Sequence, residues 1–372
     1  MNLIIAGDVV PTEKNICYFE KDLLNYLEDD FKKLWNSSDF RIFNLECPII
    51  DYGTPILKYG PSLRCENKSI KGISSLNPSL VLLGNNHIND YGVEGIDNTI
   101  KQLKSVNIDY TGIINNYNDN NDGYIFMNDG IKVGIYNFAD NEFSQATMKQ
   151  KGVRGISFLK NYQEITKLKL KVDYLIILFH GGKEYYQYPS PKLQELTELL
   201  VEWGANIVIC QHSHCIGTIS KYKGATIIYG QGNFIFDDGN NPLEKYSLVI
   251  NIKFTRENYY IDYIPIEKFN GLIRLTDKLF MNSIKKRNDE TKKIAEVYDK
   301  FEDFSFQKLN EYARIFSKPN LIKKIINRFF IKNYYIRSYS KKDLLKILNV
   351  IECEAHREVL LTSFKKYIES DD

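Results

Sequence analysis

The stretch Leu80–His87, which reads Leu-Val-Leu-Leu-Gly-Asn-Asn-His, shows the pattern that decides the fold of most of this chain. A short apolar run ends in a glycine, and polar side chains with a histidine follow at once. Such a run predicts a buried strand, with the polar residues in the loop at its carboxyl end. Similar runs occur at Leu3–Ala6, Arg41–Leu45, Lys132–Asn137, Tyr174–Phe179, Ile207–Cys210, Thr226–Tyr229 and Ser247–Ile252.

Amphipathic segments lie between these runs and predict helices. They are Glu20–Trp35, Gly92–Val106 and Ser190–Trp203. In the last of them, leucines recur at helical spacing and form one apolar stripe. Strands that alternate with helices predict an α/β domain in which helices cover both faces of the sheet.

The composition is that of a globular protein, with 372 residues, 43% hydrophobic and 26% charged. At roughly 150 residues per domain, this length predicts two domains. The net charge of +2 gives no general argument for a nucleic-acid partner. Residues 1–270 carry 27 basic and 32 acidic side chains, whereas residues 271–372 carry 22 and 15. We therefore expect an α/β domain over 1–270 and a basic, all-helical region over 271–372.

The C-terminal region contains a basic amphipathic segment. Residues 314–346 hold ten basic side chains and one acidic side chain, and Leu321, Ile325 and Phe329 recur among them at helical spacing. Three interpretations are open: the apolar stripe packs on the first domain, the helix docks on an anionic membrane surface, or it contacts nucleic acid. The last is not favoured, because no recognition motif accompanies the basic residues.

The sequence contains no apolar run long enough to span a membrane, and its first residues do not resemble a signal peptide. We therefore expect a cytoplasmic protein, which would lie at the inner face of the membrane if the basic helix docks there.

Four of the five histidines follow directly after predicted strands, as do the acidic residues Asp8 and Glu46. These histidines are His87, His180, His212 and His214. A single histidine or acid at such a place is often a hydrogen-bonded structural group or a helix cap. Because sites in α/β proteins assemble at the carboxyl ends of strands, six such residues favour one shared site. Imidazole and carboxylate ligands suit Mn, Zn or Fe, and a bridging carboxylate can hold two ions, so the pattern predicts metal-assisted hydrolysis.

Six short motifs occur in a fixed order over about the first 255 residues. They are Gly7-Asp8, Asn44-x-Glu46, Gly84-Asn85-Asn86-His87 with Asp90, His180-Gly-Gly-x-Glu184-Tyr185, Gln211-His212-x-His214 and Gly232-Asn233-Phe234. Together they resemble the CapA (PGA_cap) family of capsule and poly-γ-glutamate biosynthesis proteins, a branch of the calcineurin-like metallophosphoesterases. The resemblance implies a four-layer α/β/β/α metallophosphoesterase-like sandwich whose loops build a metal centre.

The resemblance also implies roles for individual residues. One divalent ion would be held by Asp8, Glu46 and His214, and the other by Glu46, Asn86, His180 and His212. His87 would be the catalytic proton donor or charge stabiliser, and Asp90 would orient it. Val10 stands where the broader superfamily has a histidine ligand, so one ion and two ions per chain are both open.

Five further residues are candidates for binding an anionic substrate, either a phosphoester or a carboxylate. They are Lys58, Arg64, Glu184, Tyr185 and Asn233. Lys58 and Arg64 are chosen for their charge, and the others because they belong to the motifs.

The sequence thus predicts a metal-dependent hydrolase of the phosphoesterase type in the biosynthesis of a capsule or another surface polymer. The alternative is a weakly catalytic or non-catalytic accessory protein of a complex that makes poly-γ-glutamate or polysaccharide. Partners would be the anionic substrate and, through the basic helices, a membrane surface or the synthesis complex. A nuclease is a third interpretation.

Overall fold

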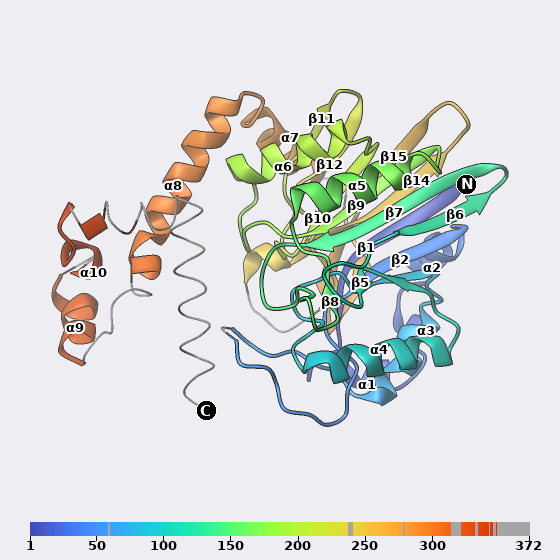
Figure 1. The fold of residues 1–372 in the computed structure, drawn as a ribbon, viewed down its shortest axis with the longest axis horizontal. Coiled ribbons are helices and arrows are strands. Elements are labelled where there is room, and N and C mark those ends of the chain that lie inside the picture. The colour runs from blue at the N-terminus through green and yellow to red at the C-terminus, as the bar shows by residue number, and fades with distance from the viewer. Residues whose placement is uncertain are drawn as a thin grey trace. The chain divides into compact units, whose positions relative to one another are not determined.

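The computed structural model describes residues 1–58, 60–236, 241–277 and 280–313, and further along the chain 321–331, 334–341, 343–344 and 347. The chain divides into two compact units, Met1–Tyr298 and Asp299–Asp372. The described strands belong to the first unit, where they form two main sheets (Figure 1).

The first sheet is built around β1 (Asn2–Val10). β1 is parallel to β2 on one side, and on the other side its first half pairs antiparallel with β14 and its second half parallel with β13. The strands of this sheet are, in spatial order, β16 (Leu272–Leu275), β15 (Tyr259–Phe269), β14 (Tyr246–Phe254), β1, β2 (Phe40–Leu45), β3 (Leu80–Leu82) and β4 (Tyr110–Thr111), with β13 (Asn233–Phe236) beside β1.

The second sheet has six strands, and its central four are parallel. Their spatial order is β11 (Ile219–Tyr222), β12 (Ala225–Ile228), β10 (Ile207–Gln211), β9 (Tyr174–His180), β7 (Ile131–Ala139) and β6 (Tyr124–Asn128). A separate pair is formed by β5 (Ile113–Ile114) and β8 (Gly152–Val153).

Successive side chains of a strand point to opposite faces of its sheet, so each sheet contributes to an apolar core on either side. On β1, Leu3 and Ile5 join a core shared with the second sheet, whereas Ile4 and Ala6 face the helices. The first sheet's outer face is covered by α1 (Ile16–Phe19), η1 (Leu23–Tyr26), α2 (Asp29–Asn36), α3 (Ile70–Ser75), which follows η2 (Asn67–Ser69), and α4 (Gly92–Ser105). α5 (Phe158–Lys169) and α6 (Pro191–Glu202) cover the second sheet. The predicted α/β/β/α sandwich is confirmed.

Two predictions of local structure were wrong. The helix expected over Glu20–Trp35 is interrupted at Leu27, whose extended backbone separates η1 from α2. The region after residue 270, expected to be helical throughout, begins with β16, which pairs antiparallel with β15. Asn270 and Gly271 both have positive φ and form the tight turn of this hairpin, a turn that the Asn-Gly pair favours.

The rest of the described C-terminal part is helical, as predicted. It contains α7 (Phe280–Asp289), α8 (Ile294–Ala313), α9 (Leu321–Ile325), η4 (Ile326–Phe330) and α10 (Tyr334–Arg337). Earlier in the chain, η3 (Pro242–Glu244) is a short 3-10 helix before β14. Within the described residues, no helix is both long and apolar enough to cross a membrane. Residues 314–320, 332–333, 342 and 345–346 of the basic segment lie outside the described residues, and the partner of this segment stays a prediction.

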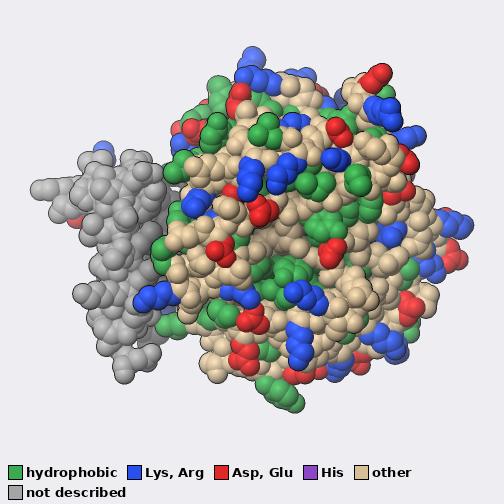
Figure 2. All heavy atoms as spheres, turned by 45° about the vertical axis from the view of Figure 1, so that its right-hand side comes forward, with side chains coloured by type: hydrophobic (Ala, Val, Ile, Leu, Met, Phe, Trp, Pro, Cys, Tyr) green, Lys and Arg blue, Asp and Glu red, His purple; other side chains and the backbone are tan. Residues whose placement is uncertain are grey.

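Charged side chains of both signs are interspersed on the face drawn in Figure 2. This face therefore carries no large field of one sign, which agrees with the net charge of +2.

Gly7 allows a close approach of β1 and β13 just before Asp8. A Cβ atom at this position would overlap the carbonyl oxygen of Gly232. Any side chain at residue 7 would push apart the strands that carry Asp8 and Asn233, which are register partners. The absence of a side chain therefore helps to place Asp8.

We predict that Gly7→Ala lowers the free energy of unfolding by about 3 kcal/mol, the upper part of the range for overpacking. Gly224→Ala is the control: this glycine has φ +84° and open space around it, so only the backbone penalty of about 1 kcal/mol applies. Urea unfolding of both variants measures the difference, and equal losses would contradict the predicted clash.

Candidate metal centre

Strand ends from both sheets bring the predicted ligands to one place. Asp8 lies near the end of β1 and Glu46 directly follows β2, while His180 ends β9 and His212 directly follows β10. The register of neighbouring strands aligns them, because Asp8 pairs with Asn44 and His180 with Gln211. These four groups and His214 are all buried.

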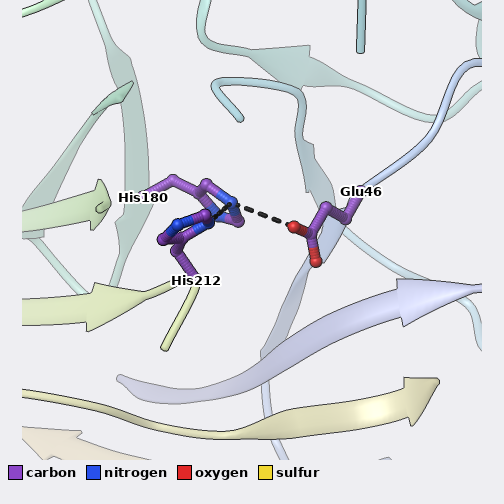
Figure 3. A group of neighbouring side chains, drawn as sticks. All are labelled: Glu46, His180 and His212. Atoms are coloured by element: carbon purple, nitrogen blue, oxygen red, sulfur yellow. Dashed lines mark hydrogen bonds and ion pairs between the residues drawn. The ribbon is translucent and has the colours of Figure 1, made fainter. Parts of the chain in front are cut away.

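One group of ligands consists of Glu46, His180 and His212 (Figure 3). His180 Nε2 lies 3.2 Å from Glu46 Oε1 and 3.3 Å from His212 Nδ1. Asn86 completes the group, since its Oδ1 is 3.0 Å from the same His180 nitrogen. The structure thus brings together all four residues predicted to hold one of the ions.

A second group consists of Asp8, Glu46 and His214, whose ligand atoms all lie within 4.8 Å of one another. Asn44 Nδ2 donates a 2.7 Å hydrogen bond to Asp8 Oδ1, which leaves Oδ2 facing His214 Nδ1 at 3.9 Å. This is the set predicted for the other ion. Glu46 belongs to both groups, as the predicted bridge requires.

The buried carboxylates have oxygen atoms that accept no hydrogen bond. These atoms are Asp8 Oδ2 and both oxygens of Glu46, whose contact with His180 has ion-pair length but not hydrogen-bond geometry. Leaving such an atom buried and unpaired costs about 1–3 kcal/mol, and more if it is charged. A divalent cation would satisfy these oxygens, and imidazole, carboxylate and amide donors suit Mn, Zn or Fe. The residues present therefore fit a metal.

Electrostatic interactions within the cluster shift the pKa values in opposite directions. Burial, helped by the charge of Glu46, raises the pKa of Asp8 to about 6. Burial acts in the same direction on Glu46, but the His214 and His180 imidazoles outweigh it and hold its pKa below the usual range. Two neighbouring carboxylates therefore compete for the same positive charge, a competition that a bound cation would relieve.

Comparison with known proteins identifies the family. Residues 2–238 match the model of the family described as bacterial capsule synthesis protein PGA_cap. The chain belongs to this family. It is 27% identical over 256 residues to the capsule biosynthesis protein CapA of Bacillus anthracis, covering 67% of this chain and 62% of that protein. It is 27% identical over 180 residues to the PGA biosynthesis protein CapA of Bacillus subtilis (strain 168), covering 48% and 47%. The match thus spans less than two thirds of either curated relative.

Two solved structures have a low similarity to this chain. A hypothetical protein from Thermus thermophilus has a TM-score of 0.46 at 11% identity, covering 72% of this chain and all of that one. A 5'-nucleotidase precursor from the same organism has a TM-score of 0.45 at 12% identity, covering 77% of this chain and 58% of that one.

The loop after β10 holds its two histidines in an unusual backbone conformation. His212 has φ +82° and His214 has φ +52°, a region that residues other than glycine adopt at a cost of about 1–3 kcal/mol. His214 Nδ1 lies 2.8 Å from Oδ1 of Asn233, the first residue of β13. Asn233, predicted to bind substrate, thus contacts a predicted metal ligand.

His87 lies beside the cluster, where Asp90 contacts its ring and Lys58 contacts Asp90. Its Nδ1 is 2.7 Å from Asp90 Oδ2, as the predicted orienting role of Asp90 requires. The ammonium of Lys58 forms an ion pair with the other oxygen of Asp90 and lies 3.2 Å from His87 Nδ1. The side chain of Lys58 is only 4% exposed. Lys58, predicted to bind substrate, therefore forms a buried ion pair with Asp90 in this structure.

Three other substrate candidates lie in different surroundings. The Arg64 guanidinium donates to the backbone carbonyls of Ile50 and Asp51 and lies over the ring of Tyr91. Tyr185 is partly exposed, and its ring centroid is 6.0 Å from that of His214. Glu184 has a carboxylate oxygen within reach of His212 and His214. Substrate binding by these residues stays a prediction.

Two acidic residues that line the centre were missed by the sequence analysis. Glu142 Oε2 accepts a 3.3 Å hydrogen bond from Asn86, and its Oε1 lies 3.8 Å from His212 Nε2. Asp140 Oδ2 accepts from the backbone of Gly182 at 3.0 Å, and burial raises the pKa of Asp140. Both follow closely after β7, so the rule that found the other strand-end residues would also have found these.

We predict that Lys58→Met lowers the free energy of unfolding by about 3 kcal/mol, because it leaves Asp90 buried without its cation. The double variant Lys58→Met/Asp90→Asn should lose less than the two single variants together. Chemical unfolding measures this cycle, and Lys192→Met, at an exposed ion pair on α6, is the control expected to cause no measurable change. Additive losses would contradict the pairing.

We also predict that the affinity for a divalent ion rises with pH between 7 and 9. Although burial opposes it, the charges of Glu46 and Asp8 raise the pKa of His214 to about 9, so the metal-free protein carries a proton there at neutral pH. Because the ion must displace that proton, affinity should rise by up to about tenfold per pH unit and level off above pH 9. Calorimetry in buffers of different ionisation enthalpy counts the released protons, and an affinity that is independent of pH would contradict the prediction.

Proposed function

We propose that this protein is a metal-dependent hydrolase of the phosphoesterase type that acts in the biosynthesis of a capsule or another surface polymer. The observation that carries this proposal is the membership of Glu46 in both ligand groups. One buried carboxylate placed between two sets of ligands is the arrangement that a pair of bridged ions needs. The ions proposed are Mn, Zn or Fe, one or two per chain.

Bound divalent ions would supply Lewis-acid polarisation of a phosphoryl oxygen and activation of water. The side chains that would hold them are Asp8, Glu46, Asn86, His180, His212 and His214. His87 engages Asp90 through Nδ1, which leaves Nε2 as the ring nitrogen that can give a proton to a leaving-group oxygen. Lys58 holds Asp90, and Asp90 holds the imidazole, so the orientation of the ring is fixed before substrate binds.

The proposed substrate is a phosphomonoester or phosphodiester of the polymer or of its precursor. The names of the two curated relatives, which refer to capsule and PGA biosynthesis, support the polymer part of this proposal. The positive charge of bound ions supports an anionic group at the reacting centre.

The second candidate is an accessory protein that keeps the fold but has little or no activity. Val10 favours it: this residue lies two positions after Asp8, is 2% exposed, and packs in the apolar core, so it offers no ligand. Contact of the basic helices with a membrane surface or a synthesis complex would suit either candidate and is likewise proposed.

The test combines metal content with hydrolysis of a generic phosphodiester, bis(p-nitrophenyl) phosphate. Wild-type protein should bind Mn²⁺ and hydrolyse the ester, and both Asp8→Ala and His212→Ala should lose metal and activity. His87→Ala should keep its metal but lose about 100-fold or more of the rate, as expected for a general acid. Asp30→Ala, at an exposed position on α2, is the control that should change neither.

The outcomes separate the two candidates. Protein that binds metal but hydrolyses no phosphoester would favour the accessory protein. Protein that binds no divalent ion would contradict the metal centre itself.

A further inference from the structure

We propose that Glu184 is an additional metal ligand of the centre, and that it binds an ion to which His214 is also a ligand. This inference rests on the proposed metal centre and deepens it. It is carried by a third group of ligand atoms, those of Glu184, His212 and His214, which all lie within 4.8 Å of one another.

The loop that carries Glu184 is fixed against the loop that carries the two histidines. The backbone N–H of Tyr185 donates a 2.9 Å hydrogen bond to the carbonyl of Ser213, the residue between His212 and His214. At the start of the same loop, the N–H of Gly181 donates to the carbonyl of Gln211 at 3.2 Å. Glu184 therefore lies between two backbone contacts that tie it to the ligand loop.

The backbone around Glu184 is held in a conformation that a free loop would not adopt. Tyr185 has φ +58°, in the left-handed region, and Gly182 has φ +105° with its N–H bound to Asp140. A strained backbone of this kind persists only where contacts with the surrounding structure hold it in place, and such positions are concentrated at functional sites. The three left-handed residues Tyr185, His212 and His214 lie in the two loops that meet at this point.

The number of ligands gives the chemical reason for a fourth group. Asp8, Glu46 and His214 supply three protein ligands, and Val10, on the same strand as Asp8, supplies none. Mn, Zn and Fe sites take four or more ligands, water included, so a further protein ligand can join these three. The Glu184 carboxylate lies within 4.8 Å of a ring nitrogen of His214, so it can supply a further ligand to an ion bound there.

Glu142 differs from Glu184 in a way that makes the assignment specific. Its carboxylate already accepts a hydrogen bond from Asn86, and it belongs to none of the three ligand groups found among the described residues. We therefore assign the metal to Glu184 and only an outer contact to Glu142.

The experiment is a Mn²⁺ titration without substrate. Calorimetry measures the affinity, and equilibrium dialysis with elemental analysis measures the number of ions bound. Glu184→Gln should bind at least one ion about 100-fold or more weakly than wild type, because loss of an outer contact alone costs 10–100-fold. Glu184→His, which restores a metal-binding side chain, should recover most of that affinity. Glu195→Gln, at an exposed position on α6, is the matched control that should bind like wild type.

A spectroscopic measurement separates a ligand from a nearby charge. With Co²⁺ in place of Mn²⁺, Glu184→Gln and Glu184→His should each change the visible absorption of the bound ion, whereas Glu195→Gln should not. Circular dichroism and the melting temperature of the metal-free variants test folding. If Glu184→Gln folds poorly, Mn²⁺ binding by Glu184→His tests the proposal, because only a ligand role predicts that histidine restores the affinity for the ion.

The failure of this inference can be told from the failure of the proposed function. Wild type that binds no Mn²⁺ contradicts the metal centre. Wild type that binds Mn²⁺, together with a Glu184→Gln variant that binds it equally well, overturns the role of Glu184 and leaves the centre intact.

Discussion

The carboxylate of Glu46, fully buried between two sheets, is the group on which the rest of this structure depends. It follows β2 of the first sheet, and one of its positive partners, His180, ends β9 of the second at 3.2 Å from it. Removing a carboxylate from water costs several kcal/mol unless opposite charge and hydrogen bonds compensate. The two sheets must therefore keep a fixed separation, which the apolar core between them provides through residues such as Leu3, Ile42 and Ile176.

Neutral amides hold the loops around this charge without adding to it. Asn44 donates to Asp8 and accepts from Asn85 at 3.0 Å, and Asn85 in turn accepts from the backbone N–H of His87 at 3.1 Å. Asn137 on the second sheet accepts from the N–H of Gly84 on the first at 2.8 Å. An amide can donate and accept at once, so this chain of contacts fixes the loops from both sheets. Because the amides are neutral, the net charge of the centre is set by its carboxylates and imidazoles alone.

The sequence could predict eight of the strands, among them β1, β2, β9 and β10, and the candidate ligands at their ends, because both follow one local rule. Each apolar run forms a strand, and the polar residues at its carboxyl end, such as Asp8 and His180, meet at one edge. The same rule, applied to β7, would have found Glu142. The β15–β16 hairpin was also within reach, since Asn270-Gly271 is a strong turn signal.

Other features could not be read from the sequence because they depend on contacts between distant segments. The partner of Lys58 is Asp90, and their meeting depends on the path of an irregular loop that has no periodic pattern. The place of Glu184 depends on how its loop docks on Ser213, which strand spacing does not determine. Local propensity likewise could not show the break at Leu27, where extended backbone interrupts an otherwise helical pattern.

The position of β1 also sets the order in which the domain can be completed during synthesis. Asp8 and Ile5 are made more than two hundred residues before their register partners Asn233 and Ile250. At about 5–20 residues per second, the wait on the ribosome is on the order of tens of seconds. Until then β1 lacks its neighbours on one side, and Asp8 and Glu46 have been made without His212 or His214. The proposed metal centre can therefore be complete only after His212 and His214 have been translated, so an ion bound by all of its ligands would be taken up late in synthesis.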